Sequence, residues 1–153
     1  MLGRPPQISV IIEISRGSFI KRGSNGELDF VSPIPCPFNY GSIHSFIGGD
    51  GDLLDAVVLG PTLPRGKLVQ VYVHGAVGFT DRGIYEDKMV CSVRQFHPYN
   101  RILVLSFFHL YAFCKSMLNV YRGYSGPTYC GGWKAAESAM IRARPKYGFD
   151  DNH

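Results

Sequence analysis

Two short segments hold half of the acidic residues of this chain. The sequence has 12 Asp and Glu residues, of which three lie within 50–55 and three within 81–87. Carboxylates that crowd together repel one another, and a bound hard cation relieves that repulsion. Mg²⁺ prefers oxygen ligands, which carboxylates supply. The two segments therefore indicate a metal site.

The first of these segments also has two other interpretations. An Asp-Gly-Asp sequence suits a turn, which needs no metal at all. An EF-hand calcium loop is excluded because its fifth position here is Leu54 instead of an oxygen ligand, and the later glutamate is absent. On these residues alone, the turn stays open beside the metal site.

The elements that must position these carboxylates are mostly strands. Runs of β-branched and alternating apolar residues predict strands at 8–14, 27–31, 54–59, 67–79 and 88–94. Three prolines in 32–41 predict an ordered loop, and helices are expected only later, at about 100–120 and 133–143. Both acidic segments therefore lie at strand ends, where carboxylates can converge on one cavity.

The order of these elements limits the fold class. A length of 153 residues predicts one domain, 1–153, and 45% hydrophobic content is enough for one core. The 18 glycines and 10 prolines favour a chain with many turns over a helical bundle. Many short strands followed by helices predict an α+β domain, or a barrel with helices packed outside.

Charge and cysteine content exclude several classes of protein. The net charge of +4 comes from scattered basic residues, and the densest group, at 142–146, suits a solvated helix end. The four cysteines form no C-x-x-C pair, so we expect neither structural zinc nor a disulfide scaffold. The start has no secretory signal, and the apolar run 102–113 is too short to span a bilayer. We therefore expect a cytoplasmic protein without a membrane partner.

Several short motifs resemble one known family. The segment 50–56 resembles the D-x-D-x-x-D motif of soluble family I inorganic pyrophosphatases, with Leu53 where that family usually has proline. Further motifs of the family are matched in order by Ile12-Glu13-Ile14, Ile20-Lys21, Pro37-Phe38-Asn39-Tyr40-Gly41, Thr80-Asp81 with Lys88, and Phe107-Phe108-x-x-Tyr111. The resemblance covers about residues 8–140, and the order and spacing of the motifs make it specific.

The resemblance implies both a fold and a function. The fold is an α+β domain built on a small closed β-barrel, OB-like with a five-stranded core, with two C-terminal helices packed outside. The function is Mg²⁺-dependent hydrolysis of inorganic pyrophosphate to two orthophosphates by a metal-activated water, with Mn²⁺ as a second possible metal. A homo-oligomer is implied as well, a hexamer if the protein is bacterial.

The resemblance also assigns roles to individual residues. Asp52 is expected to accept the proton of the attacking water, or to orient it. The expected metal ligands are Asp50, Asp55, Asp81 and Glu86, with Glu13 in support. The expected substrate-binding residues are Lys21, Tyr40, Lys88 and Tyr111.

The chain departs from the family pattern at several of these positions. Glu86 stands where the family has aspartate, and Asp87 is an alternative ligand if the loop shifts by one residue. No arginine lies near 32–33, and Ala112 replaces a lysine. Lys115 lies one helical turn beyond Tyr111, so it is expected to supply the missing cation.

These departures leave two alternatives to the enzyme. One is a diverged, weak or inactive homologue that binds phosphate or a phosphorylated metabolite. The other is an OB-like nucleic-acid-binding module, for which the basic pI of about 8.9 and the tyrosines would suit single strands. Six clustered carboxylates oppose the nucleic-acid interpretation because they repel phosphodiesters.

Overall fold

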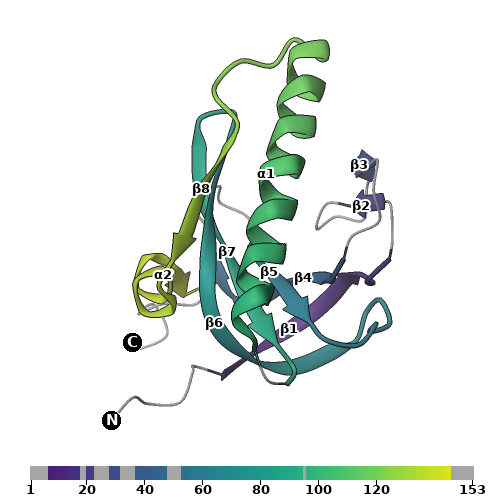
Figure 1. Ribbon diagram of the computed structural model, residues 1–153, viewed down its shortest axis with the longest axis vertical. Helices are drawn as coiled ribbons and strands as arrows, with labels where there is room; N and C mark the ends of the chain where they lie inside the picture. The colour runs from purple at the N-terminus through teal and green to yellow at the C-terminus, as the bar shows by residue number, and fades with distance from the viewer. Residues whose placement is uncertain are drawn as a thin grey trace, which may run out of the picture.

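The strands and helices account for most of the part of the chain that can be described. The computed structural model describes residues 7–17, 20–22, 28–31, 37–47, 53–94 and 96–145. Within these ranges the strands are β1 (Gln7–Ile14), β2 (Ile20–Arg22), β3 (Leu28–Val31), β4 (Asn39–Ile47), β5 (Leu53–Leu59), β6 (Leu68–Asp81), β7 (Ile84–Ser92), β8 (Tyr129–Lys134) and β9 (Arg144–Pro145). The helices are α1 (Pro98–Tyr121) and α2 (Ala136–Arg142). Figure 1 shows α1 standing along one side of the strands.

Five of the strands close into a barrel. The order is β1-β4-β5-β7-β6, and β6 pairs back to β1, so the ring is complete. The long strand β6 makes this possible, because its start pairs with β1 and its remainder pairs with β7 and β8. All pairs in the ring are antiparallel except β5–β7. The predicted α+β fold with a closed five-stranded barrel and two outer helices is confirmed.

One glycine allows the barrel to close tightly. At Gly41 in β4, any side chain would overlap the backbone carbonyl oxygen of Ile11 in the neighbouring strand β1. The two strands pair here, with Ile12 opposite Gly41. Only a residue without a Cβ atom fits such a close backbone approach.

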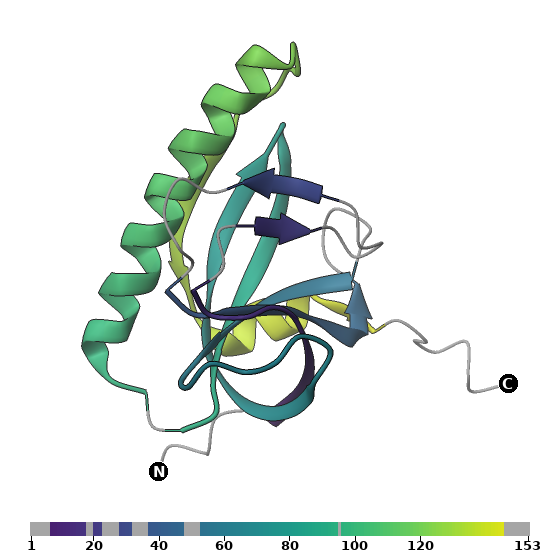
Figure 2. The same ribbon diagram turned by 90° about the vertical axis from the view of Figure 1, so that its right-hand side faces the viewer.

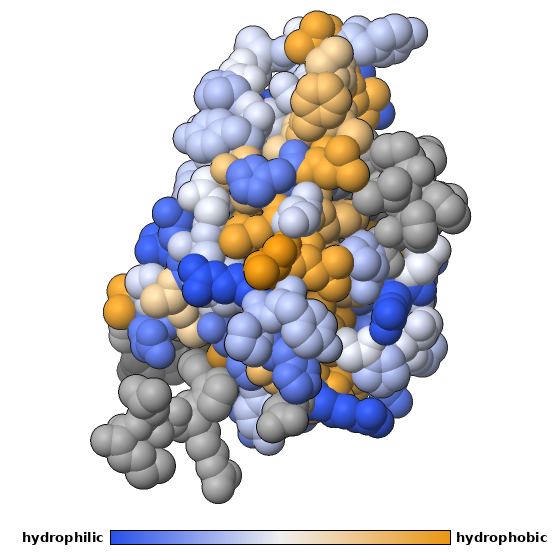
Figure 3. All heavy atoms as spheres, viewed as in Figure 1, coloured by the Kyte–Doolittle hydropathy of each residue, from blue (hydrophilic) through white to orange (hydrophobic). Residues whose placement is uncertain are grey.

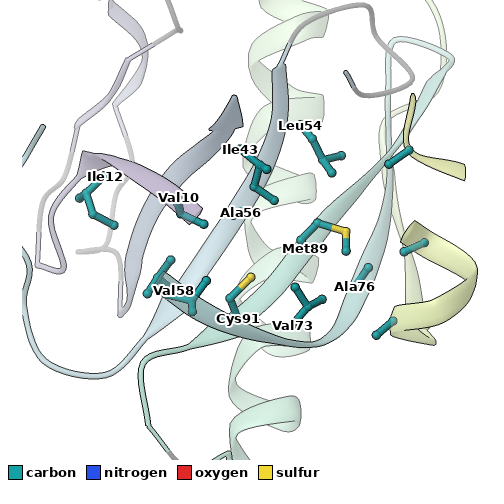
Figure 4. Packing of buried hydrophobic residues seen from close by; sticks show 14 residues of the cluster. Val10, Ile12, Ile43, Leu54, Ala56, Val58, Val73, Ala76, Met89 and Cys91 are labelled. Carbon is teal, nitrogen blue, oxygen red and sulfur yellow. The ribbon is translucent and has the colours of Figure 1, made fainter. Parts of the chain in front are cut away.

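Alternation along the strands gives the barrel two apolar faces. Successive side chains of a strand point to opposite faces of a sheet. Figure 4 shows the interior cluster, which includes alternate residues of β5 and β7. The intervening residues of the same strands belong to a second cluster, which α1 covers from outside. Polar side chains on this outer face therefore lie next to α1.

The helix α1 covers the outer face with one of its own faces. It begins with Pro98 at its first position, and the Asn100 side chain accepts a hydrogen bond from the His97 backbone N–H at 3.0 Å. It ends before Gly123, whose φ of 75° suits a helix end. In Figure 2 it lies beside β8 and β6, which it contacts.

The other face of α1 is apolar and exposed. Figure 3 shows hydrophobic side chains following the helix down the middle of this view. By length and composition α1 could cross a membrane, since an 18-residue window has a mean hydropathy of 1.4. Val104, Phe108 and Ala112 of this helix are buried in the second apolar cluster, so one face of α1 is part of the core.

The expected helix at 133–143 and the expected loop at 32–41 were wrong in part. The last helix runs from Ala136 to Arg142, and Trp133 lies in strand β8 instead of opening that helix. Trp133 pairs with Val77 of β6, and its ring fills the space above Gly75. This tertiary pairing outweighs the local helical pattern. The proposed loop is a strand from Asn39 onward, while 32–36 lie outside the described residues.

Candidate active site

A buried lysine on the outer face of the barrel holds three oxygen-bearing side chains together. The Lys88 Nζ donates to Glu86 Oε1 at 2.6 Å, to Asp55 Oδ2 at 2.9 Å and to the Tyr40 hydroxyl at 2.9 Å. Glu86 and Lys88 are two residues apart on β7, so they share a face. Tyr40 comes from β4 and Asp55 from β5, the next strands of the ring. Three side chains from three strands therefore meet at one ammonium group.

The surroundings of Lys88 keep it charged. The side chain is almost fully buried, and burial alone would lower the pKa of its ammonium group. The carboxylates of Asp55 and Glu86 outweigh that effect, and the net result raises the pKa well above its usual range. Two carboxylates therefore form ion pairs with one ammonium group.

A second cluster forms around Asp81 at the end of β6. Its Oδ1 accepts hydrogen bonds from Asn119 Nδ2 at 3.0 Å and from Thr128 Oγ1 at 3.1 Å. Its Oδ2 lies 3.7 Å from Lys115 Nζ. Lys115 and Asn119 are both on the buried face of α1. The helix thus brings a cation and an amide to the end of the strand.

Tyr111 lies between the two clusters. Its ring packs against Phe79 at 5.5 Å, and Lys88 Nζ lies over the same Phe79 ring at 5.2 Å. Tyr111 also contributes to the raised pKa of Lys88. Because Tyr111 is on the same face of α1 as Lys115, the helix spans both clusters.

Glu13 reaches the outer edge of this region from β1. Its Oε2 accepts a hydrogen bond from the Ser42 hydroxyl at 2.9 Å. Ser42 is directly opposite Asp55 in the pairing of β4 with β5. The strand register therefore brings Glu13 close to the carboxylate of Asp55.

The arrangement of these residues can be compared with known proteins. The sequence matches the inorganic pyrophosphatase family over residues 10–140, most of the chain. The chain belongs to this family. It is 33% identical over 98 residues to the inorganic pyrophosphatase of Saccharolobus solfataricus, covering 59% of this chain and 57% of the relative. It is 36% identical over 92 residues to that of Haemophilus influenzae, covering 55% and 52%.

The chain therefore spans about half the length of the curated relatives it matches. Solved structures extend the likeness in fold. The inorganic pyrophosphatase from Thermus thermophilus has a TM-score of 0.70 at 24% identity, over 90% of this chain and 87% of that one. A truncated vacuolar soluble pyrophosphatase from Trypanosoma cruzi, solved in complex with PPi, has a TM-score of 0.69 at 18% identity, over 92% and 67%.

The structure separates Glu86 from its alternative, Asp87. Asp87 points to the other face of β7, where Arg142 of α2 donates to both of its oxygens at 2.8 and 2.9 Å. The Tyr85 hydroxyl donates to it at 2.8 Å, and burial, together with this contact, raises the pKa of Tyr85 to about 12. Asp87 thus ties α2 to the barrel. Of the two alternatives, Glu86 is the residue that contacts Lys88 on the outer face.

Some of the expected site residues cannot be compared with these two clusters. Asp50 and Asp52 lie outside the described residues, and only the strand is described for Lys21. The structure brings together Tyr40, Asp55, Glu86 and Lys88, and separately Asp81 and Lys115.

Three polar residues at the site were missed by sequence reasoning. Asn119 lies on the buried face of α1, eight residues after Tyr111 and four after Lys115. That spacing was a usable signal, because residues four apart share a helix face. Ser42 and Thr128 bind residues that are distant in the sequence, so no local pattern indicates their contacts.

The residues present fit a hard metal ion in their chemistry. The described residues contain no group of three His, Cys, Asp or Glu side chains already gathered as a complete site. Asp55 and Glu86 nevertheless aim carboxylate oxygens at the same cation, the Lys88 ammonium, within 2.9 Å. Such oxygen donors are those that Mg²⁺ and Mn²⁺ prefer.

Proposed function

We propose that this protein hydrolyses inorganic pyrophosphate to two orthophosphates in the cytoplasm, with Mg²⁺ as its metal and Mn²⁺ as a substitute. The observation that carries the proposal is the partly buried group of carboxylates and cations on the face beneath α1. Asp55 and Glu86 surround Lys88, and Asp81 lies beside Lys115. A site for a metal complex of pyrophosphate needs both charges, since carboxylates hold the metal and cations hold the phosphate oxygens.

The carboxylates and the phosphate ligands have separate roles in this proposal. Asp50, Asp55, Asp81 and Glu86 would hold the metal, with Glu13 in support. When bound, the metal neutralises substrate charge and makes a nucleophilic water available near neutral pH. Asp52 would take the proton of that water. The side chains that would bind phosphate oxygens are Lys21, Tyr40, Lys88, Tyr111 and Lys115.

The bonds of Lys88 link cation binding to substrate binding. An ammonium group has three N–H donors, and those of Lys88 go to Tyr40, Asp55 and Glu86. Lys88 can donate to a phosphate oxygen only if one of these acceptors releases it. Asp55 and Glu86 lose the least electrostatic stabilisation when another cation takes the place of the ammonium. We therefore expect phosphate to bind more tightly once the metal is present.

Removal of divalent metal is expected to abolish phosphate release from pyrophosphate. Purified protein treated with EDTA should release no more phosphate than the buffer control, and added Mg²⁺ or Mn²⁺ should restore release. The measurement is colorimetric phosphate release, with p-nitrophenyl phosphate as a control substrate that should not be cleaved. Folded protein that releases no phosphate with either metal would contradict the enzyme and favour the phosphate-binding homologue. Salt-sensitive binding to single-stranded DNA, with no release, would favour the nucleic-acid module.

The exposed face of α1 supports a proposal that the protein forms a homo-oligomer. Exposed apolar side chains recur along the helix at steps of three, four or seven residues, at Tyr99, Leu103, Leu110, Phe113, Met117 and Val120. This repeat suits packing against a second helix with the same repeat. The same face on another copy of the chain supplies such a helix in a two-fold arrangement.

Charge substitution on this face is expected to break the oligomer. Light scattering coupled to gel filtration should give the parent a mass that is a multiple of 17.0 kDa. Phe113→Lys with Met117→Lys should reduce the mass to one chain. Ile141→Lys, at an exposed apolar position on α2, is the matched control and should leave the parent mass unchanged. A parent that is monomeric at about 100 µM, or that binds lipid vesicles instead of itself, would contradict the proposal.

A further inference from the structure

The Asp81 carboxylate is held by two residues that the proposed function does not use. Asn119 Nδ2 donates both to Asp81 Oδ1 and to Thr128 Oγ1, at 3.0 Å each. Thr128 Oγ1 accepts this bond and one from the Arg82 backbone N–H at 3.1 Å, so its own proton goes to Asp81 Oδ1. The three side chains form a closed triangle of hydrogen bonds.

The triangle joins three separate parts of the chain. Asp81 is the last residue of β6, Asn119 lies near the end of α1, and Thr128 precedes β8. Asp81 sits beside the turn at Arg82, whose φ is 52°, and its side chain is 31% exposed. A carboxylate at such a position can rotate freely unless neighbours hold it.

Both donors bind the same oxygen of Asp81. They occupy Oδ1, while Oδ2 faces Lys115 at 3.7 Å. Rotation of the carboxylate would break two hydrogen bonds at once. The two hydrogen bonds therefore hold the carboxylate in one orientation, with Oδ2 turned toward Lys115.

The contact with Asp81 sets the orientation of the Asn119 side chain. Asn119 is 4% exposed, and within the described part of the chain its Oδ1 has no hydrogen-bond partner. An amide that served only to fill space would be better replaced by an apolar side chain, since a buried unpaired carbonyl destabilises the fold. Turning the amide over would bring its oxygen against the Asp81 carboxylate, so the orientation follows from that contact.

We propose that Asn119 and Thr128 are positioning residues that set the affinity of Asp81 for a divalent cation. They act through Asp81, by presenting Oδ2 and withholding Oδ1, and they touch neither metal nor substrate. This inference rests on the proposed function, because it takes Asp81 as a metal ligand. Side chains that orient a metal ligand commonly change metal affinity by about 10–100-fold when they are removed.

The test compares Thr128→Val with Thr128→Ser, using Mn²⁺ as the probe. Valine keeps the shape of threonine without its hydroxyl, while serine keeps the hydroxyl. Free Mn²⁺ is measured by its EPR signal in a titration without substrate. We expect Thr128→Val to raise the Kd for Mn²⁺ by about 10–100-fold, and Thr128→Ser to bind Mn²⁺ like the parent. Asn119→Leu should behave like Thr128→Val.

A double-mutant cycle separates positioning from a purely structural role. In an Asp81→Asn background, Thr128→Val should cause no further change in the Kd for Mn²⁺, because the carboxylate is already gone. Thermal unfolding followed by circular dichroism establishes that each variant is folded. If Asn119→Leu does not fold, the Thr128 pair still decides the result.

The outcomes distinguish this inference from the proposed function. Folded Thr128→Val that binds Mn²⁺ with the parent Kd would overturn the inference and leave pyrophosphate hydrolysis untouched. An equal loss in the Asp81→Asn background would also overturn it. A parent that binds Mn²⁺ but releases no phosphate would remove the proposed hydrolysis, while the inference would stand on the Kd values. A parent that binds no Mn²⁺ would overturn both.

Discussion

Lys88→Met is expected to lower the free energy of unfolding by about 3–5 kcal/mol when no divalent metal is present. The substitution keeps most of the side-chain volume but removes the ammonium group. Asp55 and Glu86 then lie together without the cation that both now contact within 2.9 Å. Removing one partner of a buried ion pair is costly, whereas the apolar part of the methionine packs as the lysine does. The measurement is urea unfolding in EDTA.

Mg²⁺ should stabilise Lys88→Met more than it stabilises the parent. In the parent the metal must compete with the ammonium for Asp55 and Glu86, but in the variant that competitor is gone. Metal at about 100 times its Kd adds about 2.7 kcal/mol of stability. Lys67→Met is the matched control, because Lys67 is exposed, and it should unfold as the parent does with and without metal. Equal stabilisation of Lys88→Met and parent by Mg²⁺ would show that these carboxylates do not bind the metal.

The alternation of side chains on strands could be predicted from the sequence, and much of the site follows from it. Glu86 and Lys88 must share a face of β7 once this segment is known to be a strand. The same rule sends Asp87 to the opposite face, where it meets Arg142. Sequence reasoning left Glu86 and Asp87 as alternatives only because it began the strand at residue 88 instead of Ile84.

The closure of the barrel and the last strand could not be predicted locally. The start of strand β6 pairs with β1 and its remainder pairs with both β7 and β8, and no local pattern records such long-range pairing. Residues 133–134 continue β8 for the same reason, although the sequence there suits the start of a helix. Closure of the five-stranded ring was expected from the resemblance to a family, not from periodicity.

The hydrogen-bond partners of Asp81 could not be predicted from the sequence. The contact of Asn119 with Asp81 joins residues 38 positions apart, and that of Thr128 joins residues 47 apart. The helical face shared by Lys115 and Asn119 was visible in the sequence, but the strand end that this face meets was not. Conversely, the sequence is the sole source for the roles of residues 50 and 52, which lie outside the described residues.

Asp52→Asn is expected to lower kcat for pyrophosphate by about 10²–10⁴-fold at saturating Mg²⁺, the usual contribution of a general base. Asparagine is close in size to aspartate but cannot accept the proton of the attacking water. The loss should therefore not be reversed by more metal. Stability in urea should be close to that of the parent, because the substitution removes one charge from a crowded group. The measurement is steady-state phosphate release across a range of Mg²⁺ concentrations.

Comparison with Asp50→Asn distinguishes loss of a general base from loss of a metal ligand. If Asp50 is a metal ligand, its loss weakens metal binding, so activity should return as Mg²⁺ is raised. If Asp52 takes the proton, its loss persists at every Mg²⁺ concentration, and the acidic limb of the pH–rate profile should disappear in that variant alone. A loss in Asp52→Asn that high Mg²⁺ repairs would make Asp52 a metal ligand. The proton would then have to pass to another carboxylate, of which Glu86 is the nearest candidate to Lys88 among the described residues.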